Sequence, residues 1–532
     1  MNIQSEKMRR LMAVVVVGLG LAIVVVLFLV SVGPARAQIV IYVDDDTCPD
    51  TGSGSHGDPF CHIQDAVNDA LDGYEIRVAA GTYTGVQEVT VEQSGGPFTY
   101  TQVAIITRSL TLQGGYSPAD WYTPDPAANP TIIDAERQGR GISIVGTYNV
   151  HPEVTVDGFT ITGGDYTDLG NPEGVANQVC ASTSADCGGG LYAYKSALIL
   201  STSIISDNIA SRDGGQGGGL YLWDSSGLIR IENTAVISNS APATGGAGGG
   251  LCGLGIVHPF AIAHSTFQDN SADSTGGALN LYANIEALVT VTETDFLSNT
   301  SGVDSGGAYI RLTDEGELLR MDRVRFQGNQ ASSRAGALSL DAAGNLTPRA
   351  RLTNLLFAGN SLTSASASDA IVRIETMHPS LEVELAHVTA ADNSAVTFLY
   401  AEPDFYGPPN TVTVTLTNTL LFAFTNGFAA EEAGDGEVMI QHSHTLVQYV
   451  PNLHKTVGGF PTFVAVDGVS GDPMLDATYH LQGGSAAIDT GTDAGIGYDI
   501  DGDARPMGRG FDIGADEFVY YAIYVPVILR NE

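Results

Sequence analysis

The sequence has little positive charge and little charge of any kind. Lys and Arg number 23 among 532 residues, against 60 Asp and Glu, which gives a formal net charge of -37. A surface with this excess repels phosphate backbones and anionic headgroups, so nucleic acid and lipid surfaces are excluded as partners, and cations are attracted. Charged residues make up 16% of the chain whereas glycine numbers 64, a balance that favours tight turns between short strands over a helical bundle.

Long apolar runs are also scarce, and the longest stands at the N-terminus. Residues 7–10 contain three basic side chains, residues 11–32 are almost entirely apolar, and 35–37 offer small residues where a signal peptidase cuts. This pattern predicts a signal peptide over residues 1–37 and a mature chain that begins at Gln38. The alternative is an uncleaved anchor, because about 20 apolar residues can span a bilayer. In either case we expect the rest of the chain to be extracellular or at the cell surface.

Cysteine is rare, with 5 residues in the chain. Cys48 and Cys61 flank one polar loop and Cys180 and Cys187 flank another, so each pair is close enough in sequence to close its own loop with a disulfide. Export permits this oxidation. The first bridge is expected to stabilise the fold by roughly 3 kcal/mol, because it restricts the unfolded chain. Cys252 remains, in an apolar stretch, and is expected to be a free, buried thiol.

One short phrase recurs along the middle of the chain: a small or acidic residue followed by asparagine. The spacing between successive copies is 29 to 33 residues. The seven asparagines are Asn208, Asn239, Asn270, Asn299, Asn329, Asn360 and Asn393. A glycine cluster and a short alternating apolar strand follow many of the copies, as in 217–222 and 276–281. Such a constant period indicates a repeat architecture.

The repeat unit is too small to bury its own apolar face, so the units must stack. Parallel pairing of equivalent strands then gives a solenoid whose apolar side chains line one interior. We therefore predict an all-β fold, a right-handed parallel β-helix with about 30 residues per coil. The asparagines are predicted to lie ~4.8 Å apart at one corner and to exchange side-chain hydrogen bonds as a structural ladder.

The repeats from roughly Val154 to Leu421 resemble those of the pectin lyase-like superfamily. Three N-terminal motifs, at 42–45, 58–66 and 78–83, resemble the opening of secreted proteins of this class. The resemblance implies a short amphipathic helix over about 63–71. Such a helix would cap the first coil, which would otherwise expose unpaired edges and core.

The C-terminal motifs at 485–491, 499–506 and 511–517 resemble the choice-of-anchor Q domain, which ends bacterial surface and secreted β-helix proteins. The apolar stretch 521–529 is too short to span a membrane, so a sorting or docking role is expected. Membrane contact is expected only through this tail or an uncleaved signal. The predicted division of the chain is: signal peptide, 1–37; N-terminal cap and first coils, 38–150; β-helix repeats, 151–425; last coils and choice-of-anchor Q-like segment, 426–518; apolar tail, 519–532.

Function must come from local motifs, because β-helices carry lyases, hydrolases, esterases and adhesins. The residue sets typical of galacturonases and of calcium-dependent pectate lyases do not occur here. We therefore expect a non-catalytic, adhesin-like scaffold that binds a polysaccharide or another cell-surface component. The alternative is a polysaccharide lyase or glycoside hydrolase, with clustered acidic, basic and aromatic side chains in a groove across adjacent coils. Tyr192, Tyr194, Tyr221 and Trp223 are candidates for an aromatic patch.

Alternating carboxylates make Asp499, Asp501 and Asp503 the best candidates for a metal site, because hard oxygen ligands suit Ca²⁺. The spacing departs from that of an EF-hand loop. The alternative is a solvated acidic turn that is partly paired with Arg505 or Arg509. Calcium is the one cofactor that the sequence suggests.

Two late histidines raise a second metal hypothesis. His442 and His444 alternate along a predicted strand, so they would share one face and could hold a metal with a third ligand. We favour the other interpretation, in which both are polar residues on the outer face of a late coil.

Overall fold

The computed structural model describes residues 39–93, 96–169, 187–212, 214–284, 287–313, 316–344, 347–364, 366, 368–377, 380–403, 410–432 and 435–519. The chain divides into Met1–Val40 and Ile41–Glu532. The predicted signal peptide and all of the predicted tail except Val519 lie outside the described residues. Within the described ranges, no helix is long and apolar enough to cross a membrane.

The described residues form three sheets, of 21, 13 and 5 strands, and two short helical segments. The helical segments are the 3-10 turn η1 (Asp45–Thr47) and the α-helix α2 (Ile63–Asp69). The 13-stranded sheet contains β4 (Gln87–Gln93), β5 (Gly96–Ile106), β8 (Arg140–Val145), β11 (Leu191–Tyr194), β14 (Leu220–Trp223), β18 (Leu251–Ile256), β22 (Leu279–Ala283), β25 (Ala308–Leu312), β28 (Ala335–Ala342), β31 (Ala370–Thr376), β33 (Thr397–Pro403), β35 (Asn426–Glu431) and β37 (Asn452–Gly458).

The other two sheets complete each coil. The 21-stranded sheet contains β1 (Val40–Val43), β2 (Tyr74–Ala79), β3 (Gly81–Tyr83), β6 (Leu110–Tyr116), β7 (Thr131–Asp134), β9 (Glu153–Asp157), β10 (Phe159–Thr162), β12 (Ala197–Ser201), β13 (Ile204–Ser206), β15 (Ile229–Glu232), β16 (Ala235–Ile237), β19 (Phe260–Ala263), β20 (Thr266–Gln268), β23 (Val289–Leu297), β26 (Gly316–Gln327), β29 (Pro348–Ala358), β32 (Leu381–Ala391), β34 (Thr411–Phe422), β36 (Glu437–Gln448), β38 (Thr462–Val466) and β39 (Val469–Ser470). The 5-stranded sheet contains β17 (Ser240–Ala241), β21 (Ser271–Ala272), β24 (Thr300–Ser301), β27 (Gln330–Ala331) and β30 (Ser361–Leu362).

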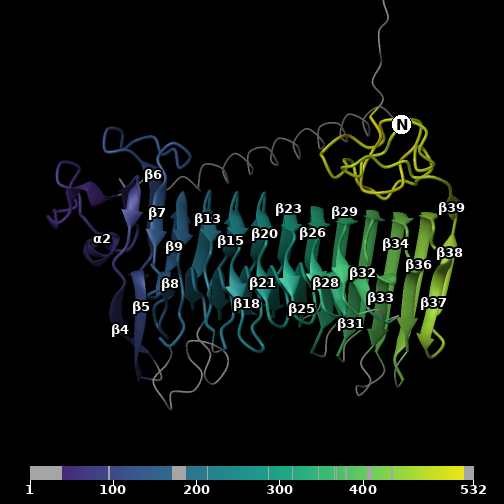
Figure 1. The fold of residues 1–532 in the computed structure, drawn as a ribbon, viewed down its shortest axis with the longest axis horizontal. Helices are drawn as coiled ribbons and strands as arrows, with labels where there is room; N and C mark the ends of the chain where they lie inside the picture. The colour runs from purple at the N-terminus through teal and green to yellow at the C-terminus, as the bar shows by residue number, and fades with distance from the viewer. Residues whose placement is uncertain are drawn as a thin grey trace, which may run out of the picture. The chain divides into compact units, whose positions relative to one another are not determined.

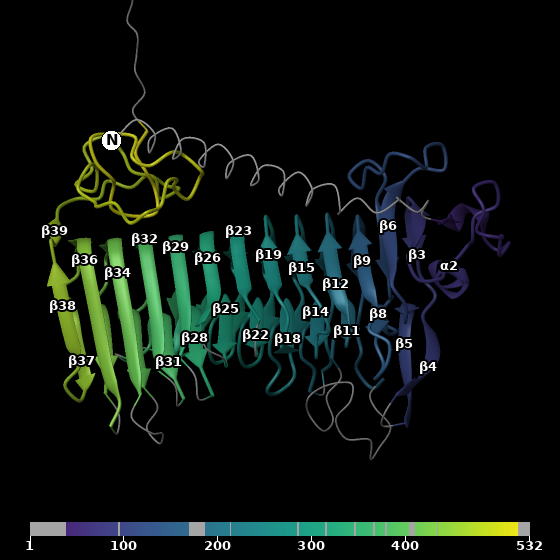
Figure 2. The same ribbon diagram turned by 180° about the vertical axis from the view of Figure 1, so that it is seen from behind.

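Strands of successive coils pair in parallel, so the chain is a right-handed parallel β-helix, as predicted (Figure 1; Figure 2). Short strand pairs such as β19 and β20 are replaced in later coils by single long strands, beginning with β23. The hairpin of β4 and β5 is antiparallel. Burial alternates along strands of the 21-stranded sheet such as β9, β23 and β34, whereas strands of the 13-stranded sheet such as β8, β11 and β28 are buried along their whole length.

Aromatic side chains stack through the interior in the same register as the backbone. Phe267, Phe296, Phe326 and Phe357 are fully buried, and the centroids of successive rings lie 5.3, 4.8 and 5.2 Å apart. The repeat thus places a phenylalanine above a phenylalanine in successive coils. Each ring stabilises the fold through the apolar area that it buries and through its stacking with the next ring. The loss of one ring would leave a void between two rings that cannot move toward each other.

The seven predicted asparagines lie one above another at a corner of the β-helix, and all are buried. The Nδ2 of each of the first six donates to the Oδ1 of the asparagine in the next coil, over 2.9–3.0 Å. The same Oδ1 accepts the backbone N–H of the asparagine in the preceding coil, at 2.9–3.1 Å. Nδ2 also donates to a backbone carbonyl, such as that of Val236 in the case of Asn270. Each asparagine side chain therefore provides hydrogen-bond partners for buried polar groups at the corner of the adjacent coil.

The residue before each of these asparagines explains the first half of the recurring phrase. All seven have a positive φ, between 54° and 67°. They are Asp207, Ser238, Asp269, Ser298, Gly328, Gly359 and Asp392. Glycine and short polar side chains enter this left-handed region at the lowest cost. The small or acidic residue thus adopts the backbone conformation that turns the chain at the corner, and the asparagine side chain forms hydrogen bonds inside that corner.

We expect Asn270→Ala to destabilise the protein by about 1–3 kcal/mol, because it leaves the buried groups of two neighbouring coils without partners. Equilibrium denaturation by urea measures this loss. The matched control is Gln330→Ala, which removes an exposed amide beside the same corner. Equal stability of the two variants would contradict a structural role for the ladder.

The two ends of the stack differ. Helix α2 covers the first coil, and its Gln64 pairs with the backbone of β5 by accepting from Ile105 N at 2.7 Å and donating to Ile105 O at 3.3 Å. The helix ends at Asp69, slightly before the predicted end. At the other end, no described strand pairs with the outer edge of β37, and Phe460 is 94% exposed.

Candidate functional site

The predicted Cys48–Cys61 disulfide is confirmed, with the two Cα atoms 5.1 Å apart. Cys187 is also disulfide-bonded, while its predicted partner Cys180 lies outside the described residues. Cys252 is free and buried, and burial raises the pKa of its thiol to about 12. Because the thiolate is the reactive form, this cysteine is inert at neutral pH.

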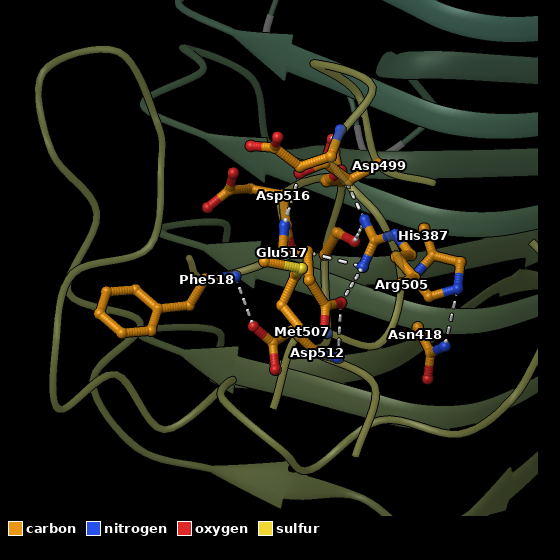
Figure 3. Close-up of polar contacts among 12 residues, drawn as sticks. His387, Asn418, Asp499, Arg505, Met507, Asp512, Asp516, Glu517 and Phe518 are labelled. Carbon is orange, nitrogen blue, oxygen red and sulfur yellow. Dashed lines mark hydrogen bonds and ion pairs between the residues drawn. The ribbon is translucent and has the colours of Figure 1, made fainter. Parts of the chain in front are cut away.

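The predicted calcium ligands lie in residues 471–519, a segment in which the described backbone forms neither helix nor strand. Asp499 is fully buried, and both of its carboxylate oxygens accept backbone N–H groups (Figure 3). Oδ1 accepts from Asp501 and Asp503 at 2.9 and 2.8 Å, and Oδ2 accepts from Glu517 at 2.9 Å. The carboxylate of Asp499 thus supplies the acceptors that a strand partner would otherwise supply.

Asp501 and Asp503 do not join Asp499 around a common position. The Oδ1 of Asp501 lies 2.6 Å from Arg325 on β26, and its Oδ2 lies 2.7 Å from Nε2 of His480. The side chain of Asp503 is exposed. Among the described residues, groups with ligand atoms within 4.8 Å of one another do not include this trio, so the structure does not assemble the predicted calcium site.

A different group, His480, Asp501 and Asp516, does bring its ligand atoms within 4.8 Å of one another. Hydrogen bonds account for all three side chains. Asp516 accepts the backbone N–H of Leu481 at 2.7 Å, and Asp501 pairs with His480 and with Arg325. Burial raises the pKa of Asp516 to about 6. This group joins the C-terminal segment to the β-helix through direct contacts.

Arg505 lies at the centre of the C-terminal segment (Figure 3). It pairs with Glu517 at 2.8 Å, rather than with the acidic turn as the alternative interpretation expected, and both side chains are 0% exposed. Its NH2 group donates to the carbonyl oxygens of Gly514 and Ala515, at 3.1 and 2.6 Å. Glu517 also accepts the backbone N–H of Met507 at 2.9 Å. The ion pair therefore holds two parts of the segment together, the backbone at Met507 and the backbone at Gly514 and Ala515.

The C-terminal segment, yellow in Figure 1, lies beside the ends of the long strands, and side chains of the β-helix hold it there. Thr389 on β32 accepts the N–H of Ala515 at 2.9 Å. Asn418 on β34 donates to the carbonyl of Thr492 at 2.7 Å and accepts its N–H at 2.9 Å. His387 lies 3.2 Å from Asn418, and burial lowers the pKa of this imidazole to about 3, so it stays neutral. The segment is thus attached to the outer wall by backbone-directed contacts.

His442 lies inside the β-helix, so the favoured outer-face interpretation was wrong for this residue. Its Nε2 is 2.7 Å from Nε2 of His454 and its Nδ1 is 2.9 Å from Thr445 Oγ1. Its ring also packs against Phe428, with centroids 5.0 Å apart. Burial, together with His454, lowers the pKa of His442 to about 4. His444 has a φ of 47°, so the chain turns between the two histidines and they do not share a face.

The four candidate aromatic residues do lie together, on β11 and β14. The rings of Tyr192 and Tyr221 stack with centroids 5.9 Å apart, and those of Tyr194 and Trp223 lie 5.0 Å apart. The three tyrosines are buried, in a cluster that includes Phe98 from the β4–β5 hairpin. They form a small second core and not an exposed surface for sugars.

A pocket of about 590 Å³ opens on the 13-stranded sheet and is lined by residues of β22 to β35. Figure 2 shows β22, β25, β28 and β31 of this sheet. We call it the polar pocket. The side chains that line it include Tyr282, Arg311, Arg334, Glu375, Glu402 and Glu431. It combines aromatic, basic and acidic groups from adjacent coils.

One register position on five adjacent strands carries most of this chemistry. The residues at that position, from β22 to β33, are Tyr282, Arg311, Asp341, Glu375 and Glu402. The position two residues earlier carries Tyr309, Ser339, Arg373 and Tyr400 on the later four strands. Residues two apart on a strand point to the same side, so both rows face outward together.

Asp341 belongs to this row, but its neighbours bury it. One of its carboxylate oxygens accepts hydrogen bonds, and the other has no partner among the described residues. Its Oδ2 accepts from the hydroxyl of Tyr309 at 2.7 Å and from Nε of Arg311 at 2.6 Å. Its Oδ1 is buried and has no hydrogen-bond partner. Burial raises the pKa of Asp341 to about 6, although Arg311 opposes the shift. This carboxyl group is therefore poised to exchange a proton near neutral pH.

Glu375 has the opposite electrostatic environment. It pairs with Arg334 at 2.5 Å and with Arg373 at 2.8 Å, and these two guanidinium groups lower its pKa despite its burial. Arg334 also pairs with Asp304 at 2.9 Å, and Arg373 with Glu402. Neighbouring carboxyl groups in the pocket thus differ in their affinity for protons.

The hydroxyl of Tyr400 lies within hydrogen-bond distance of two glutamates of the pocket, Glu402 and Glu431. Its hydroxyl lies 2.7 Å from Oε2 of Glu402 and 2.8 Å from Oε2 of Glu431. Burial raises the pKa of Tyr400, so the phenol keeps its proton. Burial also raises the pKa of Glu402, the effect being opposed by Arg373.

No model of a known protein family matches the chain, and no curated protein matches it. The likeness of the C-terminal motifs to the choice-of-anchor Q domain stays a prediction. Among solved structures, the chain is similar to one titled "Crystal structure of pectate lyase Pel9A", with 13% sequence identity. The match covers 91% of this chain and 97% of that chain, at a TM-score of 0.36. The parallel β-helix itself follows from the strand pairing within this chain.

Proposed function

We propose that the protein is an extracellular β-helix scaffold that binds a polysaccharide in the polar pocket. The observation that carries the proposal is the row of aromatic, basic and acidic side chains at one register position of adjacent strands. A polymer needs repeated contacts along its length, and parallel strands offer them every ~4.8 Å. Export, which the N-terminal sequence predicts, would place the pocket where such polymers occur.

The chemistry of the pocket suits sugars. Tyr282 is half-buried and lies beneath the guanidinium of Arg311, whose Cζ is 4.9 Å from the ring centroid. A flat ring and directional hydrogen-bonding groups are the usual means of holding a sugar ring in an open pocket. The ion pairs fix the polar groups before the ligand arrives, which reduces the entropy cost of binding.

A glycoside hydrolase is the second candidate, favoured by the carboxyl groups of the same row. The pKa of Asp341 is raised to about 6 and the pKa of Glu375 is lowered. Carboxyl groups whose environments separate their pKa values are the acid and base of glycoside hydrolysis. Asp341 and Glu375 stand on adjacent strands, ~4.8 Å between backbones, close to the separation of the two carboxyl groups in retaining enzymes.

One experiment tests both candidates. Purified protein without residues 1–37 is titrated with a panel of soluble polysaccharides, and new reducing ends are measured in the same samples. We expect Tyr282→Ala to weaken binding at least about tenfold, because it removes the exposed aromatic contact. Arg349→Ala, an exposed arginine on β29 of the other large sheet, is the matched control.

The outcomes separate the candidates. Release of reducing ends that Asp341→Asn abolishes, with binding retained, would establish hydrolysis. Binding without release supports the scaffold. Equal binding by the wild type and by Tyr282→Ala would contradict the polar pocket as the site.

A further inference from the structure

The polar pocket carries more negative than positive charge. The charged side chains that line it are Arg311 and Arg334 on one side and Asp304, Glu375, Glu402 and Glu431 on the other, and two further charged side chains, Asp341 and Arg373, are bonded to this lining. Three positive charges face five negative ones, an excess of two when all are ionised. Each arginine is already bonded to at least one carboxylate, so none is free to hold an anionic sugar.

The excess is concentrated at one end of the pocket. Asp341 is matched by Arg311, and Arg334 and Arg373 lie between Asp304, Glu375 and Glu402. Within the described part of the chain, Glu431 forms no ion pair, and its side chain accepts a hydrogen bond from the hydroxyl of Tyr400. Lys455, on the next strand, does not line the pocket.

The two acids at this end compete for one proton donor. The hydroxyl of Tyr400 has a single proton, yet it lies within 2.8 Å of both Glu402 and Glu431. Two ionised carboxylates cannot both accept that proton, so the second contact holds only if one acid is protonated. A ligand that brings several N–H donors and a positive charge would satisfy both carboxylates at once.

We propose that the pocket selects an amine-bearing glycan, with the ammonium group of an amino sugar seated between Glu402 and Glu431. The proposal rests on the proposed function and names its ligand class. An ammonium group offers three donors and one positive charge, which match two carboxylates beside one phenol. A uronate chain would place its carboxylates against the excess of negative charge, so it is excluded.

Calorimetric titration with three soluble oligosaccharides tests this proposal at fixed ionic strength and slightly acidic pH. The probes are a β-1,4 oligomer of glucosamine, its fully N-acetylated equivalent, and an oligogalacturonate of the same length. We expect the glucosamine oligomer to bind about tenfold or more tightly than the acetylated one, and the oligogalacturonate not to bind. Glu431→Gln, which keeps the shape of the side chain, should remove most of this preference.

The matched control is Glu153→Gln on β9, an exposed glutamate of the other large sheet. If both variants weaken the glucosamine oligomer equally, the attraction comes from the overall charge and the proposal is overturned. Equal affinity for the amine and acetylated oligomers also overturns it, while leaving the pocket as a binding site. If no oligosaccharide binds and Tyr282→Ala changes nothing, the proposed function itself fails.

Discussion

Replacing Arg505 with methionine is expected to destabilise the C-terminal segment by about 3–5 kcal/mol. The substitution keeps much of the buried volume but leaves the carboxylate of Glu517 buried without a cation, since both side chains are fully inaccessible. It also frees the carbonyl oxygens of Gly514 and Ala515, which now accept from the guanidinium. Hydrogen exchange of the amides of residues 487–519, read by mass spectrometry, measures the local opening.

Two further variants decide whether the ion pair is the cause. Arg509→Met removes an exposed arginine of the same segment and should leave exchange unchanged. The double variant Arg505→Met with Glu517→Leu removes both charges, and should recover much of the lost protection, because no buried charge remains unpaired. A double variant as unprotected as Arg505→Met would show that the donor hydrogen bonds, and not the charge, hold the segment.

Removing one ring from the interior stack should be equally costly. Phe326→Ala is expected to lower the free energy of unfolding by about 3–5 kcal/mol, because Phe296 and Phe357 are held by their own strands and cannot fill the void. Their ring centroids lie 4.8 and 5.2 Å from that of Phe326. Urea denaturation monitored by circular dichroism measures the change.

The exposed Phe460 provides the comparison, since Phe460→Ala deletes the same atoms from a ring that is 94% exposed. A loss below about 1 kcal/mol is expected there. Similar losses for both variants would mean that the stack closes around the missing ring.

The fold could be predicted from the sequence because the regular spacing of the asparagines reports the length of one coil. Asparagines 29 to 33 residues apart can hydrogen-bond to one another only if each lies one coil above the last, and their side chains do so. The preceding residue, such as Asp269, also marked the corner correctly because few residue types accept its backbone conformation. The predicted capping helix and the Cys48–Cys61 bridge rest on equally local patterns.

The site was not predictable, because its residues meet only through register. Arg311, Asp341 and Glu375 belong to three coils joined by loops of unequal length, so no window of sequence brings them together. A sign was nevertheless present. A single charged residue follows the apolar run in β25 and in β28, and β31 carries two, Arg373 and Glu375, so aligning the strands would have stacked these charges.

The contacts of Asp499, Asp501 and Asp503 were not predictable for a different reason. Its alternating aspartates do share one turn, but a carboxylate can serve a cation or a backbone amide, and sequence spacing does not distinguish the two. Asp499 serves amides, and Asp501 serves Arg325 and His480, which lie far away in the sequence. Aspartates that could have bound a cation therefore hold the C-terminal segment together and attach it to the β-helix.

The unequal ends of the β-helix limit how copies of this protein could associate. Helix α2 closes one end, whereas the outer edge of β37 at the other end keeps backbone donors and acceptors that no described strand uses. Strand addition is thus available at the edge of β37. Two copies that joined there would meet through identical surfaces related by a two-fold axis.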